Sequence, residues 1–346
     1  MKKNNQAKIL LNIIFIAVII GVICKVFGGQ SEEIIEQIRK MTFATLFIII
    51  LCSAFFNIAD GLAYYVMAKR YNDNFKWYQG VGCSYYCAFF RLTTFGSGTA
   101  ASGMYYLHKY NVPMQNSFGM ITINYIVQKI AIVLMCLIFF AGNYGIMKEY
   151  YSEYFEYVLL GVIVTILVAV ALLTVVLWKK FHDFLLFLAE KVIKNIELKE
   201  RIKLLGNKLE SLREESRIML KEKGTMLKLL LLNMVKYLGW YMMPCVVLGY
   251  TDINNIIRGL CISALASALI GVIPSPGASG STEAMFYVLF LAVADKAEAV
   301  AVMLMYRCFT YIFPFAVGGI MILVKRIMDK RKYKKILDMQ IKQSEN

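Results

Sequence analysis

The chain has 346 residues, of which 59% are hydrophobic and 18% charged, and its formal net charge is +15. An average soluble domain is about 45–50% apolar, and several uninterrupted apolar runs here approach the roughly 20 residues that a helix needs to cross a bilayer. This composition excludes an ordinary soluble protein. We predict an all-α integral membrane protein that forms a single polytopic membrane domain over residues 1–346.

Six apolar segments are long enough to be full membrane spans. They cover residues 9–27, 43–66, 117–141, 157–178, 227–250 and 299–324. The first follows a charged N-terminus, as in a signal peptide, but its apolar run is too long for a signal peptide and no small-x-small cleavage pattern follows. We therefore interpret it as a retained span.

Two further regions, about 77–112 and 257–296, each have two short apolar arms around a centre rich in glycine, serine or proline. Each arm is too short to cross a bilayer comfortably alone. Irregular backbone is tolerated at membrane depth only where protein or a wet cavity shelters it. Each region is therefore predicted to be either a re-entrant hairpin or a pair of tilted, broken spans.

The distribution of lysine and arginine predicts the orientation. Most of the 38 basic residues fall in the N-terminal tail, in residues 67–76 and 179–226, and in a basic tail over 325–346. Because such loops stay cytoplasmic, we predict that both termini are cytoplasmic. Segment 179–226 has mixed charge and apolar positions at helical spacing, which favours a cytoplasmic helical linker; a helix lying on anionic headgroups is the alternative. The same bias explains the net charge, so we expect no nucleic-acid partner.

The two irregular regions resemble each other. Residues 92–107 read "LTTFGSGTAASGMYYL" and residues 272–289 read "VIPSPGASGSTEAMFYVL". Both place a break of small residues before an apolar arm that contains aromatic side chains. Aligning Gly98 with Gly277 superimposes the two breaks.

The same alignment brings Gln128 opposite Arg307, and both lie inside the next apolar span. The first break is entered from the cytoplasmic face and the second from outside. We therefore predict an inverted repeat, with a first unit over about 43–141 and a second over about 227–324. Transporters built from inverted repeats place their binding site near the midplane, where the broken helices meet.

Several ionisable residues lie within or at the edge of apolar runs. They are Asp60, Arg91, Lys129, Lys236, Glu283 and Arg307. Charges in such positions are costly and usually face a cavity or a partner. For Asp60, Arg91 and Lys236 the alternative is a position near the interface, from which a long side chain reaches the surface. Glu283 and Arg307 are stronger candidates, whose partner is either each other or a charged headgroup.

The chemistry of these residues favours an anionic ligand. The planar arginine fork suits phosphate, and a helix expected to begin near Ser279 would direct its free N–H groups at an anion. An anionic phospholipid headgroup fits such a site, although a sugar or a small ion stays open. The candidate substrate-binding residues are Glu283, Arg307, Gly277, Gly280, Ser279, Pro276, Gly96, Gly98, Arg91, Gln128 and Lys129.

Metal and nucleotide chemistry are not indicated. The eight cysteines are scattered without a Cys-x-x-Cys pair, and His108 and His182 are far apart, so metal-site and disulfide-framework patterns are not met. No phosphate-binding loop of the G-x-x-x-x-G-K-[ST] type occurs. We expect no metal, no other cofactor and no catalytic residue on this chain.

The sequence also resembles a known family. The stretch "PGASGSTE" at 276–283, followed by Arg307, is similar to the motif of the lysylphosphatidylglycerol synthase transmembrane (flippase-like) family, the membrane half of the bacterial multiple peptide resistance factor. The first-half counterpart is "GSG" at 96–98. The resemblance covers roughly residues 8–326.

The resemblance implies a function. In that family a soluble domain transfers lysine from lysyl-tRNA to phosphatidylglycerol, and the membrane domain moves the product to the outer leaflet, where the cationic lipid repels antimicrobial peptides. The chain ends soon after its last predicted span, so we expect no aminoacyl-transferase on it. Ala278 and Ser279 replace a glycine and an apolar residue common in the motif, and Thr282 replaces a frequent basic residue. Substrate identity therefore stays open.

Two classes of function follow. The first is a lipid translocase of the bacterial cytoplasmic membrane that moves an anionic or aminoacylated phospholipid such as lysylphosphatidylglycerol. The alternative is the membrane subunit of a phosphatidylglycerol lysyltransferase whose catalytic domain is on another chain. A non-transporting scaffold is disfavoured by the charges at helix breaks. The expected partners are the phospholipid and the membrane, with a separate synthase or a second copy of the chain as further possibilities.

Overall fold

The computed structural model describes residues 41–145, 221–271 and 280–344, with a few isolated residues outside these ranges. All regular structure in the described ranges is helical, in agreement with the predicted all-α class. The elements are α3 (Phe43–Ala68), α4 (Trp77–Thr93), α5 (Thr99–His108), α6 (Met114–Gly142), α11 (Lys223–Val247), α12 (Ile253–Ile270), α13 (Ser281–Phe290), α14 (Lys296–Arg307), the π-helix η3 (Cys308–Ile312) and α15 (Phe313–Ser344).

Five segments of the described residues are long and apolar enough to cross a membrane. They are Phe43–Ala68, Met114–Gly142, Lys223–Val247, Ile253–Ile270 and Lys296–Asp329. Four of them lie where the sequence predicts full spans. The expectation of a short arm is wrong for Ile253–Ile270, whose 18 residues reach spanning length. The predicted span 9–27, much of 157–178 and most of the linker 179–226 lie outside the described residues.

The two halves of the chain present their helices in the same order. A long helix (α3 or α11) is followed by a medium one (α4 or α12), a ten-residue one (α5 or α13) and a further long segment. The alignment of the two breaks also places Gly80 opposite Gly259. A Cβ at Gly80 would overlap the carbonyl oxygen of Gly61, and a Cβ at Gly259 would overlap the sulfur of Cys245. Each glycine thus lets the second helix of its half pack closely on the first, while the inverted repeat itself stays a prediction.

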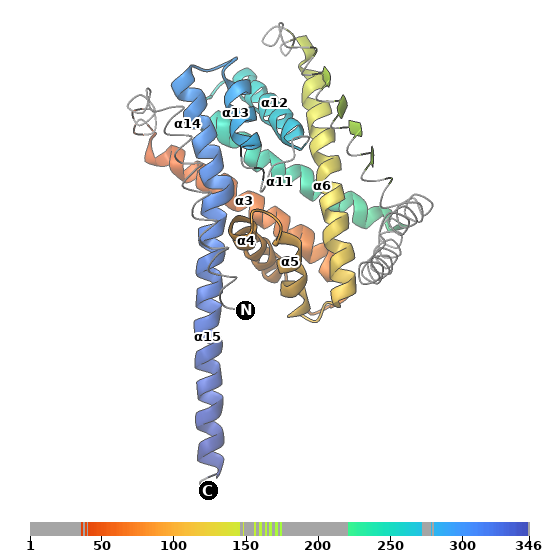
Figure 1. Cartoon of the computed structure of the whole chain (residues 1–346), viewed down its shortest axis with the longest axis vertical. Helices are drawn as coiled ribbons and strands as arrows, with labels where there is room; N and C mark the ends of the chain where they lie inside the picture. The colour runs from red at the N-terminus through yellow and green to blue at the C-terminus, as the bar shows by residue number, and fades with distance from the viewer. Residues whose placement is uncertain are drawn as a thin grey trace, which may run out of the picture.

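The first helices of the two halves, α3 and α11, pack against each other and cross the middle of the molecule (Figure 1). Helices α4 and α5 lie toward one end of the bundle, and α12 and α13 lie toward the other. One apolar core surrounds α4 and α5 and includes Met67 and Leu107. A second core surrounds α12 to α14 and includes Leu265 and Phe286. The halves therefore meet along α3 and α11, between two separate cores.

Helix α15 continues without interruption to Ser344, so the predicted basic tail 325–346 is helical as far as that residue. Figure 1 shows this helix extending well beyond the rest of the bundle. Its membrane-level part leaves large apolar side chains exposed, such as Ile320 and Leu323. These side chains are suited to contact with lipid.

We predict from the charge distribution that the loop after α5 is cytoplasmic and the loop before α12 is external. Single cysteines at Lys109 and Asp252, both exposed positions, are placed in a cysteine-free background and treated with an impermeant thiol reagent. Position 252 is expected to react in intact cells, and position 109 only after the membrane is opened. Labelling of both positions from the same side would contradict the predicted topology.

Candidate functional site

Glu283 and Arg307 form an ion pair after the second break. The Nε of Arg307 lies 3.0 Å from Oε1 of Glu283, and each side chain is 15% exposed. Glu283 belongs to the first turn of α13, and Arg307 is the last residue of α14. The structure thus brings together the two residues that the sequence singles out as possible partners. Substrate binding by this pair stays a prediction.

The carboxylate of Glu283 also caps its own helix. Its Oε2 accepts the backbone N–H of Gly280 at 2.7 Å, and Gly280 has φ +84°, in the left-handed region that favours glycine. The positive end of α13 is therefore already faced by a carboxylate. Of the predicted site residues in this break, three lie outside the described residues: Pro276, Gly277 and Ser279.

A second arginine, from the first half of the chain, approaches the same place. The guanidinium carbon of Arg307 lies 3.8 Å from the ring centre of Tyr311, and that of Arg91 lies 4.8 Å from the same centre. Arg91 also lies 5.9 Å from the ring centre of Trp240. Cations are attracted to aromatic faces, so Tyr311 holds the two guanidinium groups near each other. Arg91 therefore belongs to the same cluster as Arg307, and its role in substrate binding stays a prediction.

The π-helix η3 explains how Arg91 is held. In a π-helix the backbone follows an i→i+5 pattern, which is rare and often marks functional sites. Arg91 Nη2 donates to the carbonyl oxygen of Thr310 at 3.1 Å, and Ser53 Oγ donates to that of Phe309 at 2.6 Å. Side chains from α4 and α3 thus bind carbonyl groups of the second half. The Nε of Arg91 is buried and donates to no acceptor within the described part of the chain.

The glycines of the first break shape the backbone. Gly96 has φ +87°, and its N–H donates to the carbonyl oxygen of Arg91 at 2.8 Å. The N–H of Gly98 donates to Oγ1 of Thr94 at 2.7 Å, and a Cβ at Gly98 would lie 2.8 Å from that side chain. Helix α4 therefore ends at Thr93, two residues after Arg91. Its two predicted site glycines position that arginine through the backbone.

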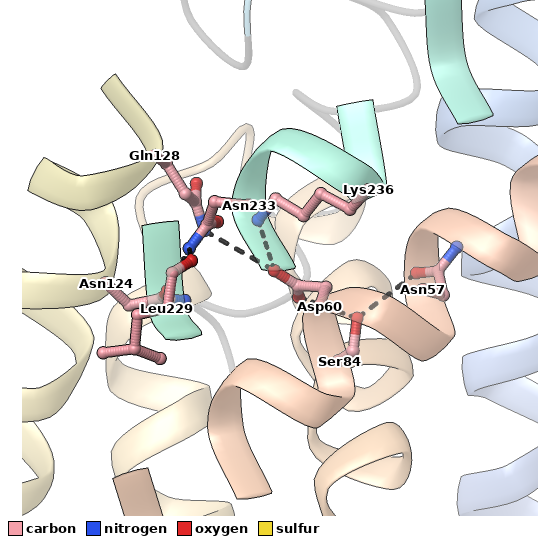
Figure 2. Close-up of polar contacts among 8 residues, drawn as sticks. All are labelled: Asn57, Asp60, Ser84, Asn124, Gln128, Leu229, Asn233 and Lys236. Atoms are coloured by element: carbon pink, nitrogen blue, oxygen red, sulfur yellow. Dashed lines mark hydrogen bonds and ion pairs between the residues drawn. The ribbon is translucent and has the colours of Figure 1, made fainter. Parts of the chain in front are cut away.

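A second ion pair joins α3 and α11. Lys236 Nζ lies 2.6 Å from Oδ1 of Asp60, and the whole of Lys236 is 0% exposed. Figure 2 shows the lysine extending from α11 toward the carboxylate on α3. The alternative in which these two side chains reach the membrane surface is therefore wrong. Sequence reasoning named both residues but did not pair them, and 176 positions separate them along the chain.

Neutral polar side chains surround this pair. Ser84 Oγ donates to Oδ2 of Asp60 at 2.8 Å, and Gln128 Nε2 approaches Oδ1 at 3.5 Å. One turn away, Asn233 donates to Oδ1 of Asn124 at 3.2 Å. These residues come from α4, α6 and α11 and converge between the two halves (Figure 2). Gln128 thus belongs to the Asp60 network, while its repeat counterpart Arg307 belongs to the Glu283 pair.

The side chain of Lys129 lies near a different part of the structure. Its Nζ lies 5.4 Å from the ring centre of Tyr125. A Cβ added to Gly271 would lie 3.3 Å from the same Nζ atom. Gly271 is the C-cap residue of α12 and lies immediately before the second break. A cation from the first half therefore reaches the start of the break in the second half.

An open cavity of about 840 Å³ lies between α4, α5 and α15. Tyrosines and basic residues line it, among them Tyr106, Tyr110 and Lys325. Lys325 Nζ contacts the hydroxyl oxygen of Tyr110 at 2.9 Å. Sequence reasoning missed this cavity because its lining residues come from three helices and follow no common motif.

The helical fold and its candidate spans define a multi-pass α-helical membrane protein. Residues 9–318 match the model of the family described as the lysylphosphatidylglycerol synthase TM region, and the chain belongs to this family. None of the curated proteins compared with the chain matches it. Family membership confirms the resemblance and connects the chain with lysylphosphatidylglycerol metabolism or transport.

Proposed function

We propose that the chain moves an anionic or aminoacylated phospholipid, such as lysylphosphatidylglycerol, between the two leaflets of the bacterial cytoplasmic membrane. The family assignment supports a lipid-related membrane role. The cluster formed by Arg91, Arg307, Tyr311 and Glu283, here called the arginine cluster, supports the choice of substrate. It is assembled from both halves of the chain, as the site of a transporter with alternating access should be.

The observation that carries the proposal is the charge of the arginine cluster. Two guanidinium groups approach one tyrosine ring, and Glu283 pairs with the guanidinium of Arg307. Buried charges need compensation, and arginine binds phosphate oxygens through charge-assisted hydrogen bonds. The buried Nε of Arg91 offers a donor without an acceptor in the described residues. A phosphate group would supply both the negative charge and that acceptor.

An aminoacylated headgroup carries both signs of charge. In the proposed complex the phosphate lies between Arg91 and Arg307, and the ammonium of the lysyl group pairs with Glu283. The intramolecular ion pair at 3.0 Å is then exchanged for two contacts with the lipid. When the ion pair opens, Glu283 and Arg307 each gain a lipid partner of opposite charge, so neither of these two side chains is stranded in a low-dielectric interior.

The test uses liposomes that contain the purified chain and lysylphosphatidylglycerol in one leaflet, with appearance in the other leaflet followed by an impermeant amine reagent. Arg91→Gln is expected to slow this appearance. Loss of a hydrogen bond to a charged group costs about 1.5–3 kcal/mol, which corresponds to roughly a ten- to hundred-fold lower rate at limiting substrate.

Arg70→Gln is the matched control. Arg70 also pairs with a glutamate, Glu222, at 2.6 Å, but in an ion pair whose glutamate side chain is 44% exposed. This control should translocate lipid at the wild-type rate. Equal rates for Arg91→Gln and wild type would remove Arg91 from the site. A chain that moves no supplied lipid, yet is required for lysylation by a separate synthase, would favour the alternative of a lysyltransferase subunit.

A further inference from the structure

We propose that Asp60 and Lys236 form a proton-binding site that couples lipid movement to a proton gradient. The inference rests on the proposed translocase function and concerns a cluster separate from the arginine cluster. It follows from three observations: the dependence of Lys236 on one carboxylate, the greater exposure of that carboxylate, and the position of the pair between the two halves.

Lys236 depends on Asp60 for its charge. An ammonium carries three donors, and within the described residues its one hydrogen-bond acceptor is Oδ1 of Asp60 at 2.6 Å. The remaining contacts of Nζ are aromatic faces, with the ring centres of Phe56 and Tyr237 at 5.2 and 5.4 Å. Neutralising the carboxylate would leave a buried ammonium with aromatic faces alone, an arrangement that buried charges do not tolerate.

Asp60 is the more accessible member of the pair. Its side chain is 13% exposed, against 1% for the side chain of Lys236. Its two oxygens accept from Ser84 and Gln128 as well as from Lys236. A proton that reaches this cluster would therefore bind a carboxylate oxygen of Asp60. No other bond forms or breaks, and the same proton later returns to solution on the opposite side of the membrane.

The pair lies where the two halves meet. Asp60 is on α3 and Lys236 is on α11, the two helices that pack together in the centre of the molecule. While both groups are charged, their attraction holds α3 against α11. Protonation of Asp60 would remove this attraction, because it removes the negative charge. Proton binding and movement of the halves are therefore linked, and each favours the other.

Other titratable or charged groups on these helices do not offer an equivalent site. Those near the pair include Tyr64 on α3, Cys83, Cys87 and Arg91 on α4, Tyr125 and Lys129 on α6, Tyr237 on α11 and Tyr306 on α14. Phenols and thiols ordinarily stay protonated near neutral pH, and arginine stays charged. None of these neighbouring groups is a carboxyl group, so we assign the proton to Asp60.

The experiment uses liposomes with the purified chain, lysylphosphatidylglycerol and a trapped pH-sensitive dye, while potassium and valinomycin clamp the electrical potential. Lipid movement and internal pH are recorded together, with pH gradients of both directions and with none. For the wild type we expect faster lipid movement in one gradient direction and a proton flux that accompanies it. For an Asp60→Asn/Lys236→Met double variant, which strands no charge, we expect loss of both the gradient response and the proton flux.

Glu222→Gln is the matched control, because Arg70 and Glu222 form another 2.6 Å ion pair, between the residues that follow α3 and those that precede α11, but at an exposed position. It should keep the gradient response. If lipid movement by the wild type does not respond to the gradient and no proton flux accompanies it, proton coupling is excluded. The translocase function is not affected by that result. A wild-type chain that moves no lipid would overturn both. A double variant with the wild-type gradient response would also overturn the proposal, and the wild-type comparison decides the matter if that variant does not fold.

Discussion

Glu283→Gln is expected to abolish lipid translocation and to destabilise the protein, because it leaves Arg307 without its carboxylate. Removing one partner of a buried ion pair costs about 3–5 kcal/mol, and the 15% exposure of both side chains favours the lower end of that range. Glutamine can still accept the N–H of Gly280, since a capping box uses either glutamate or glutamine. The substitution therefore removes the charge and keeps the cap of α13.

The measurement is a double-mutant cycle on the free energy of unfolding in detergent, with lipid translocation recorded for each variant. Arg307→Gln should destabilise in the same way. The double variant should lose less stability than the sum of the two singles, because neither charge is stranded. Its lipid translocation should still fail, since the phosphate has lost an arginine. Additive losses of stability would exclude direct coupling, and wild-type translocation by the double variant would remove both residues from the mechanism.

Lys236→Met is expected to have an equally large effect on stability. It leaves the carboxylate of Asp60 buried without its cation, at a cost of about 3–5 kcal/mol. This is a large part of the roughly 5–15 kcal/mol by which folded domains are stable, so reduced yield of folded protein is expected. Asp60→Asn should act similarly, because it strands the ammonium of Lys236, which is 0% exposed.

The Asp60→Asn/Lys236→Met double variant should recover most of the lost stability, since buried ion pairs can be replaced by uncharged side chains at little cost. The unfolding free energies of the two singles and the double are compared with that of Glu222→Gln, whose exposed ion pair should contribute no more than about 1 kcal/mol. If the buried substitutions cost no more than this surface control, the pair does not hold α3 and α11 together.

The sequence was sufficient for the class of fold and for four of the five candidate spans, because apolar length is a local property. It underestimated α12, which has only 18 residues and is rich in small and hydroxyl side chains. The structure shows why those residues are small: Ser263, Ala264 and Ala268 are buried against neighbouring helices. Small residues let helices approach closely in a membrane, so a packed span and a short arm look alike in the sequence.

In the candidate site, too, the sequence predicted local features and missed contacts between distant residues. Glu283 and Arg307 follow one break in one half of the chain, so a local pattern was enough to propose their pairing. Lys236 meets Asp60 across 176 positions, and Arg91 meets Thr310 across 219. No periodicity shows which faces of two distant helices will touch. The π-helix is equally hidden, because a single wider turn leaves no repeated spacing to detect.

The π-helix over Cys308–Ile312 also has an evolutionary consequence. A wider turn is what one inserted residue leaves behind in an α-helix, and each residue rotates the remainder of a helix by about 100°. Gly318 of α15 lies so close to α4 that a Cβ there would overlap the carbonyl oxygen of Tyr85. Deleting one residue from the wide turn would rotate Gly318 away from this contact and displace the carbonyl groups that Ser53 and Arg91 bind. Selection can therefore exchange side chains along this turn more readily than it can add or remove a residue, so related sequences should preserve the length of the turn before they preserve its composition.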